Sequence, residues 1–210
     1  RALPEGFLDR VSSTLDYIET RLPDYDNLLF TNAVFINRTK GIGVMNQQQA
    51  LEWGVTGPNL RATGLAFDVR RDDPYLVYDQ LEFDIPTEQA GDAWARTLVR
   101  RQELMQSIRI LRQVLRALPD IQGPIRCPIP NPLAWNVPAG EAYSRVESSK
   151  GETCYYVVSD GSDMPYRVHI RGPSSMHAVQ VLENLVKGCR IEDVAQIMFS
   201  LDACPPEVDR

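Results

Sequence analysis

The chain has 210 residues and a formal net charge of −6, from 22 Lys and Arg against 28 Asp and Glu. Hydrophobic residues make up 43% and charged residues 24%, a composition typical of globular proteins that excludes a disordered chain. A chain this acidic is not expected to bind nucleic acid unless its basic residues gather on one face. No apolar run approaches the roughly 18 residues of a membrane span.

The first third of the chain predicts short helices. Apolar residues between positions 7 and 22 recur at spacings of three and four, which predicts an amphipathic helix that Pro23 ends. Residues 27–36 predict a second, shorter helix. Asn46 is a typical N-cap for a third helix, which Gly54 ends.

The middle third contains an irregular stretch and one long helix. Residues 57–86 are rich in Gly, Pro and Asp, with a β-like patch at 81–85, and this pattern is typical of a functional loop region. Residues 92–118 give the clearest helix, with apolar residues at helical spacing up to Pro119. The opposite face of this helix carries Arg96, Arg100, Arg101, Arg109, Arg112 and Arg116. We favour a solvated surface for this face, and a docking face for an acidic partner subunit is the alternative.

The last third changes to β-like alternation. Residues 119–140 hold six prolines and predict an extended connector. Short turns then separate three β-like runs, which predicts an antiparallel meander. The runs are residues 142–146, 153–158 and 166–170. Two helices follow, at about 175–186 and 191–199.

These elements predict a mainly α fold, in which a helical body carries a small three-stranded antiparallel β-sheet. We expect residues 1–140 to form the helical body with its Gly- and Pro-rich segment. Residues 141–210 are expected to form the β-meander, two helices and a C-terminal tail. We expect both parts to make one compact unit.

The potential metal ligands are few and scattered. The four cysteines are Cys127, Cys154, Cys189 and Cys204, and the two histidines are His169 and His177. Because no two cysteines form a C-x-x-C pair, the sequence does not predict a self-contained zinc or iron–sulfur site. We expect reduced cysteines, with Cys154 and Cys189 as small buried apolar residues.

Several motifs, in order along the chain, resemble one family. They are residues 57–64 (GPNLRATG), 147–152 (ESSKGE), 159–162 (SDGS), 165–167 (PYR), 170–174 (IRGPS) and the terminal 207–210 (EVDR). This series is similar to the 49 kDa-type subunit of proton-pumping NADH:quinone oxidoreductase, or respiratory complex I. That family falls within the superfamily of [NiFe] hydrogenase large subunits. The resemblance implies a hydrogenase large-subunit-like helical body, of which this chain would be the C-terminal portion.

The tail departs from both patterns. Hydrogenases bind nickel there through Asp-Pro-Cys-x-x-Cys, whereas this chain has Cys204 at the first cysteine and Glu207 at the second. The 49 kDa-type subunits usually have Val and Glu at these two positions. Because a nickel–iron centre of this type needs four thiolates, one thiolate and a carboxylate do not reproduce it. The resemblance therefore implies a metal-free cavity wall.

In this family the cavity is the head of a quinone chamber, and the resemblance implies that Asp202, Cys204, Glu207 and Lys150 line or support it. Glu207 would deliver protons or hold an arginine, or else it is a purely structural carboxylate paired with an arginine. Cys204 would line the pocket, with a buried filler as the alternative. Lys150 is either a charged wall residue or a turn lysine in water. We expect no catalytic residue in this chain, because the quinone-gripping Tyr and His belong to the N-terminal half. We expect His177 to be a packed structural residue.

The resemblance also implies the surroundings of the chain. It would bind no redox cofactor itself, with quinone as the substrate and electrons from an iron–sulfur cluster of a partner subunit. Its partners would be other subunits of the peripheral and membrane arms, at the cytoplasmic face of an energy-transducing membrane. One alternative is the large subunit of an energy-converting hydrogenase or a sulfur-reductase-like complex with a degenerate metal site. A non-catalytic scaffold protein is another.

Overall fold

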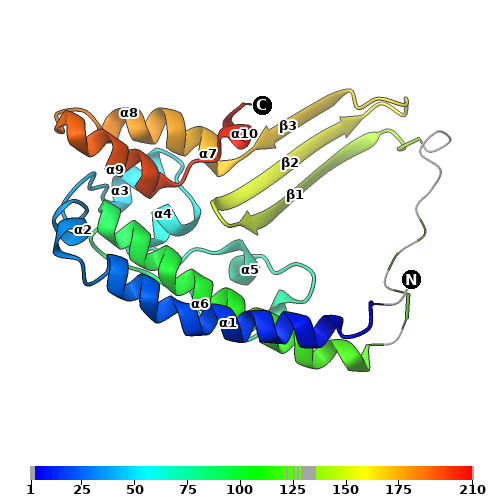
Figure 1. The fold of residues 1–210 in the computed structure, drawn as a ribbon. Helices are drawn as coiled ribbons and strands as arrows, with labels where there is room; N and C mark the ends of the chain where they lie inside the picture. The colour runs from blue at the N-terminus through cyan, green and yellow to red at the C-terminus, as the bar shows by residue number, and fades with distance from the viewer. Residues whose placement is uncertain (1–2, 122, 125, 127, 129–135, 210) are drawn as a thin grey trace.

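The computed structural model describes residues 3–209, except 122, 125, 127 and 129–135. Two long helices, α1 (Phe7–Leu29) and α6 (Ala93–Ala117), lie side by side along one edge of the molecule (Figure 1). Short helices fill the chain between them: α2 (Ala33–Asn37), α3 (Gln47–Glu52), α4 (Gly57–Arg61), α5 (Val69–Asp72) and a 3-10 turn at Tyr78–Gln80. This arrangement and the sheet described below confirm the mainly α fold class.

The first helix is longer than the sequence predicts, because α1 runs through Pro23 for almost two more turns. A proline inside a helix removes one backbone hydrogen bond and costs about 3 kcal/mol. Tertiary contacts on both sides of Pro23 hold the helix: Leu22 is buried against Ile108 of α6, and Asp26 forms two hydrogen bonds with Arg101 at 2.6 and 2.8 Å. The single helix predicted over residues 27–36 is therefore wrong.

The chain between α1 and α3 instead forms a separate short helix. The side chain of Asn32 accepts hydrogen bonds from the N–H groups of Val34 and Phe35 and so begins α2. The N-cap predicted at Asn46 is confirmed, and its side chain forms a capping box with Gln49.

The β-like patch at 81–85 is not a strand. The backbone N–H groups of Glu82 and Asp84 donate to the side-chain amides of Gln113 and Gln106, at 2.8 and 3.0 Å. Both glutamines belong to α6, so this helix supplies the hydrogen-bond partners that a neighbouring strand would otherwise provide.

The predicted meander is confirmed. Strands β1 (Gly140–Ser148), β2 (Gly151–Ser159) and β3 (Arg167–Arg171) pair in that order and antiparallel (Figure 1). The β1–β2 turn packs directly on α4. A Cβ atom on Gly57 would lie 2.3 Å from the Cα of Gly151, and both glycines have positive φ. Only glycine at these two positions lets the two backbones meet so closely.

The rest of the fold is helical. A continuous stretch contains α7 (Pro173–Met176), a π-helical turn (His177–Val181) and α8 (Leu182–Leu185), and it is followed by α9 (Ile191–Leu201) and the short α10 (Pro205–Val208). The main core joins these to the first half of the chain. It contains Met45, Ala50, Val55, Leu60, Val181, Ile197 and Leu201. The predicted site residues Lys150 and Asp202 lie close to this core, where α6, the end of α9 and the β1–β2 turn meet.

Candidate functional site

Asp202 ends α9 in a left-handed backbone conformation, with φ 55° and ψ 43°. Its carboxylate Oδ2 lies 2.5 Å from Nζ of Lys150 and 3.4 Å from Nε of Arg100. Lys150 comes from the β1–β2 turn and Arg100 from α6, so three distant segments meet at this carboxylate. Two of the four residues predicted for the site, Lys150 and Asp202, are thus in direct contact.

The other two predicted residues, Cys204 and Glu207, bind the start of α7. The N–H of Cys204 donates to Oγ of Ser174 at 3.0 Å, and the N–H of Ser174 donates to the carboxylate of Glu207 at 3.1 Å. Glu207 is buried and Cys204 is half-buried. A carboxylate at a helix N-terminus is favourable even without a basic side chain. In the described part of the chain, Glu207 binds a backbone N–H, where the sequence suggested an arginine.

The arginines of α6 do not form the solvated face that we favoured. Arg96 and Arg100 are largely buried against the end of α9. Arg96 donates to Oγ of Ser200 and to the carbonyls of Gly43 and Gly91, at 2.8–3.0 Å.

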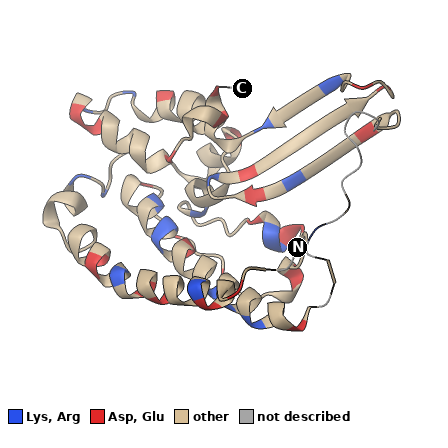
Figure 2. Ribbon diagram, turned by 45° about the vertical axis from the view of Figure 1, so that its right-hand side comes forward, with Lys and Arg blue, Asp and Glu red and all other residues tan. Residues whose placement is uncertain are grey.

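Three other arginines of α6 pair with carboxylates of the chain. Arg101 pairs with Asp26, Arg109 with Asp84, and Arg112 with Asp16 and Glu19. Figure 2 shows acidic and basic residues interspersed along α1 and α6. Much of this positive charge is therefore balanced internally, which also weakens the alternative of a docking face for an acidic partner.

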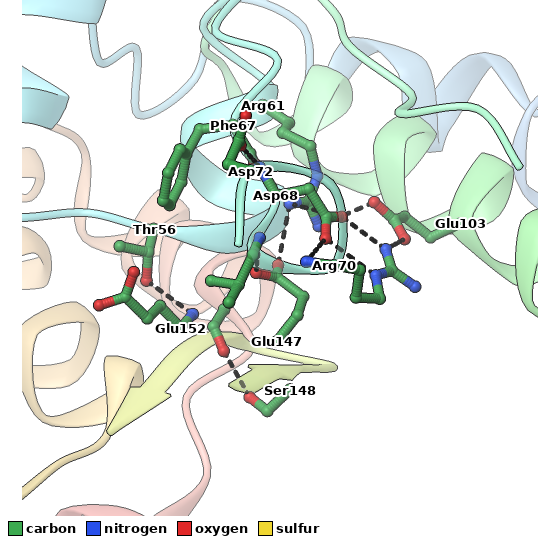
Figure 3. A network of polar contacts seen from close by, with 12 residues as sticks. Thr56, Arg61, Phe67, Asp68, Arg70, Asp72, Glu103, Glu147, Ser148 and Glu152 are labelled. Atoms are coloured by element: carbon green, nitrogen blue, oxygen red, sulfur yellow. Dashed lines mark hydrogen bonds and ion pairs between the residues drawn. The ribbon is translucent and has the colours of Figure 1, made fainter. Parts of the chain in front are cut away.

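Figure 3 shows a largely buried group of charges, the Arg61 cluster, which borders the same hollow as Asp202. It consists of Arg61, Asp68, Arg70, Glu103 and Glu147. The guanidinium of Arg61 lies 2.9 Å from Glu147, 2.8 Å from Glu103 and 3.4 Å from Asp68. Arg70 binds both oxygens of Asp68, at 2.9 and 2.6 Å, and lies 3.2 Å from Glu103. Each carboxylate thus faces at least one guanidinium.

Burial shifts the titration of these groups. Burial raises the pKa of Glu147, although the neighbouring charge of Arg61 opposes this rise. Burial lowers the pKa of Arg100 to about 10, and Asp202 opposes that change. Arg100 therefore remains charged at neutral pH.

Two hollows meet at Asp202. One, of about 340 Å³, is charged and is bordered by Arg61, Arg70, Arg100, Glu103, Glu147 and Asp202. The other is an apolar groove of about 680 Å³, whose apolar lining includes Leu182, Met198, Phe199, Leu201, Ala203 and Val208. Asp202 lines both hollows. It is therefore the predicted site residue that connects a charged environment with an apolar one.

His177 is fully buried at the edge of the groove, which agrees with the packed histidine that we expect from the sequence. The Nδ2 group of Asn59 lies 3.1 Å from Nδ1 of His177 and 2.9 Å from the carbonyl of Leu201. Oδ1 of Asn59 accepts from Arg100 at 2.7 Å, which fixes the amide orientation. Asn59 thus donates to Nδ1, so the proton of the neutral ring is on Nε2. Burial and the nearby Arg100 and Arg96 lower the pKa of His177 to about 3.

Sequence reasoning missed several residues that lie at or beside these hollows. Asn59, Arg61 and Glu147 all belong to motifs that identify the family, but the motifs alone gave no reason to bury them together. Arg100 was visible only as part of an arginine-rich helix face. Among the described residues, no three His, Cys, Asp or Glu side chains come close enough to hold one metal ion. No described helix is both long and apolar enough to cross a membrane.

Comparison with known proteins identifies the class. The family model for the 49 kDa subunit of respiratory-chain NADH dehydrogenase matches residues 1–132 and 132–210. The chain therefore belongs to this family, as its motifs predicted.

Individual relatives belong to several kinds of oxidoreductase. The chain is 46% identical to the D subunit of NADH-quinone oxidoreductase from Thermosipho melanesiensis, over 95% of this chain and 54% of the relative. It is 42% identical to the D subunit of F(420)H(2) dehydrogenase from Methanosarcina mazei, over 99% of this chain and 56% of the relative. A chain of the membrane-bound sulfane sulfur reductase, an archaeal respiratory membrane complex, is 50% identical with a TM-score of 0.92.

The coverage is unequal in each of these comparisons. All of this chain aligns with 57% of the sulfane sulfur reductase chain. The chain thus spans a little more than half the length of the relatives that it matches.

Proposed function

We propose that this chain forms a wall of the quinone chamber of a complex I-like oxidoreductase, where quinone accepts electrons from NADH or another donor. The observation that carries the proposal is the position of Asp202. Its carboxylate borders both the apolar groove and the charged hollow, and it is held by Lys150. Quinone reduction needs this combination, because an apolar ring must bind beside groups that can hold charge and protons.

Each predicted residue then has a distinct role. Lys150 and Asp202 supply charge at the mouth of the groove, where reduction of the quinone places negative charge on its oxygens. Cys204 follows Ala203 and precedes Pro205, which both line the groove, but its own half-buried side chain is not part of that lining, so Cys204 supports the wall rather than forming it. Glu207 holds the tail against α7 through Ser174 and so supports the wall.

In this proposal the chain binds no redox cofactor. Electrons come from an iron–sulfur cluster in a partner subunit. The chain docks on other subunits of the peripheral and membrane arms, at the cytoplasmic face of an energy-transducing membrane. The names of its relatives support a place in a respiratory complex.

A second function, reduction of sulfane sulfur, is favoured by one comparison and one residue. The chain of the archaeal sulfane sulfur reductase complex is 50% identical over the whole of this chain. Cys204 provides a half-buried thiol beside the groove, and a thiolate is the nucleophile that attacks sulfur–sulfur bonds.

Activity of the assembled complex separates these functions. We expect Lys150→Gln and Asp202→Asn to lower quinone reduction at least tenfold while assembly stays intact. We expect Cys204→Val to leave quinone reduction unchanged, since valine is apolar and close to cysteine in size. Arg109→Gln, on the exposed side of α6, is the matched control.

The opposite results are equally clear. Loss of sulfane sulfur reduction in Cys204→Val, with no quinone reduction in the unaltered complex, would establish the second function. Full activity of Lys150→Gln and Asp202→Asn toward both acceptors would leave the chain a scaffold, and the proposal would be wrong.

A further inference from the structure

Arg100 contacts both the side chain of Asp202 and the backbone that leads to it. Its Nη1 donates to the carbonyl of Ser200 at 2.7 Å, and its Nη2 to the carbonyl of Leu201 at 3.2 Å. These are the last two carbonyls before Asp202. Its Nε lies 3.4 Å from the carboxylate of Asp202 itself. One guanidinium thus holds the end of α9 and also faces the carboxylate that follows it.

The conformation of Asp202 needs such support. Its φ of 55° lies in the left-handed region, which residues other than glycine adopt infrequently. The C-terminal carbonyls of α9 carry the negative end of the helix dipole, and a guanidinium there neutralises it. The contacts of Arg100 with residues 200 and 201 therefore stabilise the helix end at the point where the chain turns into the left-handed residue.

The position of Arg100 is itself fixed from the other side. Nη2 donates to Oδ1 of Asn59 at 2.7 Å, and Asn59 is completely buried. Nδ2 of the same amide faces the carbonyl of Leu201 and Nδ1 of His177. Because the two ends of the amide bind different partners, Asn59 cannot rotate without losing several hydrogen bonds at once. Arg100 is thus held between a rigid amide and the end of α9.

We propose that Arg100 is a positioning residue of the site, which holds Asp202 in its left-handed conformation and its carboxylate between the charged hollow and the groove. Lys150 cannot do this, because its contact with Asp202 is through the side chain and its own backbone lies in the β1–β2 turn. The inference deepens the proposed function and rests on it, since it explains how the carboxylate assigned there reaches its position.

The first test is amide hydrogen exchange in the assembled complex, which requires no assumption about the substrate. The N–H of Asp202 donates to the carbonyl of Phe199, and the N–H of Cys204 donates to Ser174, so both amides report on the order of this segment. In Arg100→Lys, which keeps the charge but not the fork of donors, we expect exchange of residues 202–204 to rise roughly tenfold.

Arg101→Lys is the matched control, because the neighbouring arginine pairs with Asp26 on the α1 side of the helix. We expect its exchange at residues 202–204 to equal that of the unaltered complex. Equal exchange in Arg100→Lys as well would overturn the inference, whatever the activity of the complex.

The second test is a double-mutant cycle on kcat for quinone reduction, measured per assembled complex. If Arg100 acts through Asp202, then Arg100→Lys and Asp202→Asn each lower kcat about tenfold, and the double variant is no slower than Asp202→Asn alone. We expect the KM for quinone to stay within about twofold. Independent effects, which multiply to about a hundredfold, would overturn the inference.

The two tests distinguish the failures. If Asp202→Asn retains full kcat while Arg100→Lys still raises exchange at residues 202–204, the positioning role stands and the proposed function of Asp202 is wrong. If Arg100→Lys prevents assembly, Arg100→Gln, which keeps a planar amide donor, is measured in the same exchange experiment. Unchanged exchange in that variant overturns the inference.

Discussion

The two hollows beside Asp202 differ in how their polar groups are satisfied. In the Arg61 cluster, each buried carboxylate faces a guanidinium, and the positive and negative charges are interleaved (Figure 3). At the groove, most of the lining is apolar, and the neutral imidazole of His177 lies in it together with the carboxylate of Asp202. Nε2 of His177 has no hydrogen-bond partner among the described residues.

This difference suits the charges of the Arg61 cluster to a structural role and the pair of Lys150 and Asp202 to a functional one. A buried cluster in which each carboxylate faces a guanidinium contributes mainly by fixing one arrangement of α4, α5, α6 and β1, and removing one member strongly destabilises it. A half-exposed pair such as Lys150 and Asp202 contributes little to stability and is free to respond to a bound molecule. Variants of each region should therefore show opposite effects on stability and activity.

The largest expected loss of stability comes from Arg61→Met. Removing this guanidinium leaves Glu147 and Glu103 buried with less positive charge beside them, so we expect the free energy of unfolding to fall by about 3–5 kcal/mol. Urea unfolding measures this loss. Arg109→Met, whose ion pairs are exposed, is the control and should cost less than about 1 kcal/mol. Similar losses in both variants would show that the Arg61 cluster is no more important than a surface pair.

Acid should destabilise the groove through His177. Its pKa in the folded chain is about 3, below the ordinary value of 6.5, so the unfolded chain takes up the proton first. This group imposes no penalty above pH 7, and its penalty grows as pH falls from 6.5 toward 3, reaching roughly 4 kcal/mol.

The comparison with His177→Gln isolates this effect, because every other ionisable group is the same in both proteins. We expect the difference in the free energy of unfolding between the two proteins to change in favour of the variant as pH falls from 7 to 4. A difference that stays constant over this range would mean that His177 is accessible to protons in the folded chain.

The sequence predicted the elements well where local patterns decide them. The helix over residues 92–118 and the three strands follow from spacing and turns alone. The helix end at Pro23 was predicted wrongly, because contacts of Leu22 and Asp26 with α6 outweigh the local cost of proline. Local sequence carries no information about such contacts.

The site was predictable only in part, because many of its contacts join residues that lie far apart in the sequence. The family resemblance placed Lys150 and Asp202 in one site, and the structure brings them into contact. Arg96 and Arg100 were interpreted as surface residues, because four-residue spacing of arginines is typical of a solvated helix face. Their hydrogen-bond partners in α9 lie about a hundred residues away in the sequence, so only the folded chain shows that the end of α9 covers them.

A smaller effect is expected from Glu207→Gln. The glutamine keeps the size of the side chain but loses the negative charge at the N-terminus of α7, so we expect a loss of about 1–2 kcal/mol in urea unfolding. Gly172→Ala should cost at least as much, because its Cβ would lie 2.4 Å from Cγ of Glu207. Asp209→Asn, on the exposed tail, is the control. If Glu207→Gln is as stable as the unaltered chain, the carboxylate is not needed to hold the tail.

The smallest effect on stability is expected from Lys150→Gln, although this variant should have one of the largest effects on activity. The side chains of Lys150 and Asp202 are 26% and 39% exposed, so solvent screens their attraction, and the free energy of unfolding should change by less than about 1 kcal/mol. Arg100 still faces Asp202 in this variant and keeps the carboxylate in place. Quinone reduction should nevertheless fall at least tenfold, because the cation beside the groove is lost. A stability loss as large as that of Arg61→Met would place Lys150 with the structural charges, and the contrast between the two hollows would then be wrong.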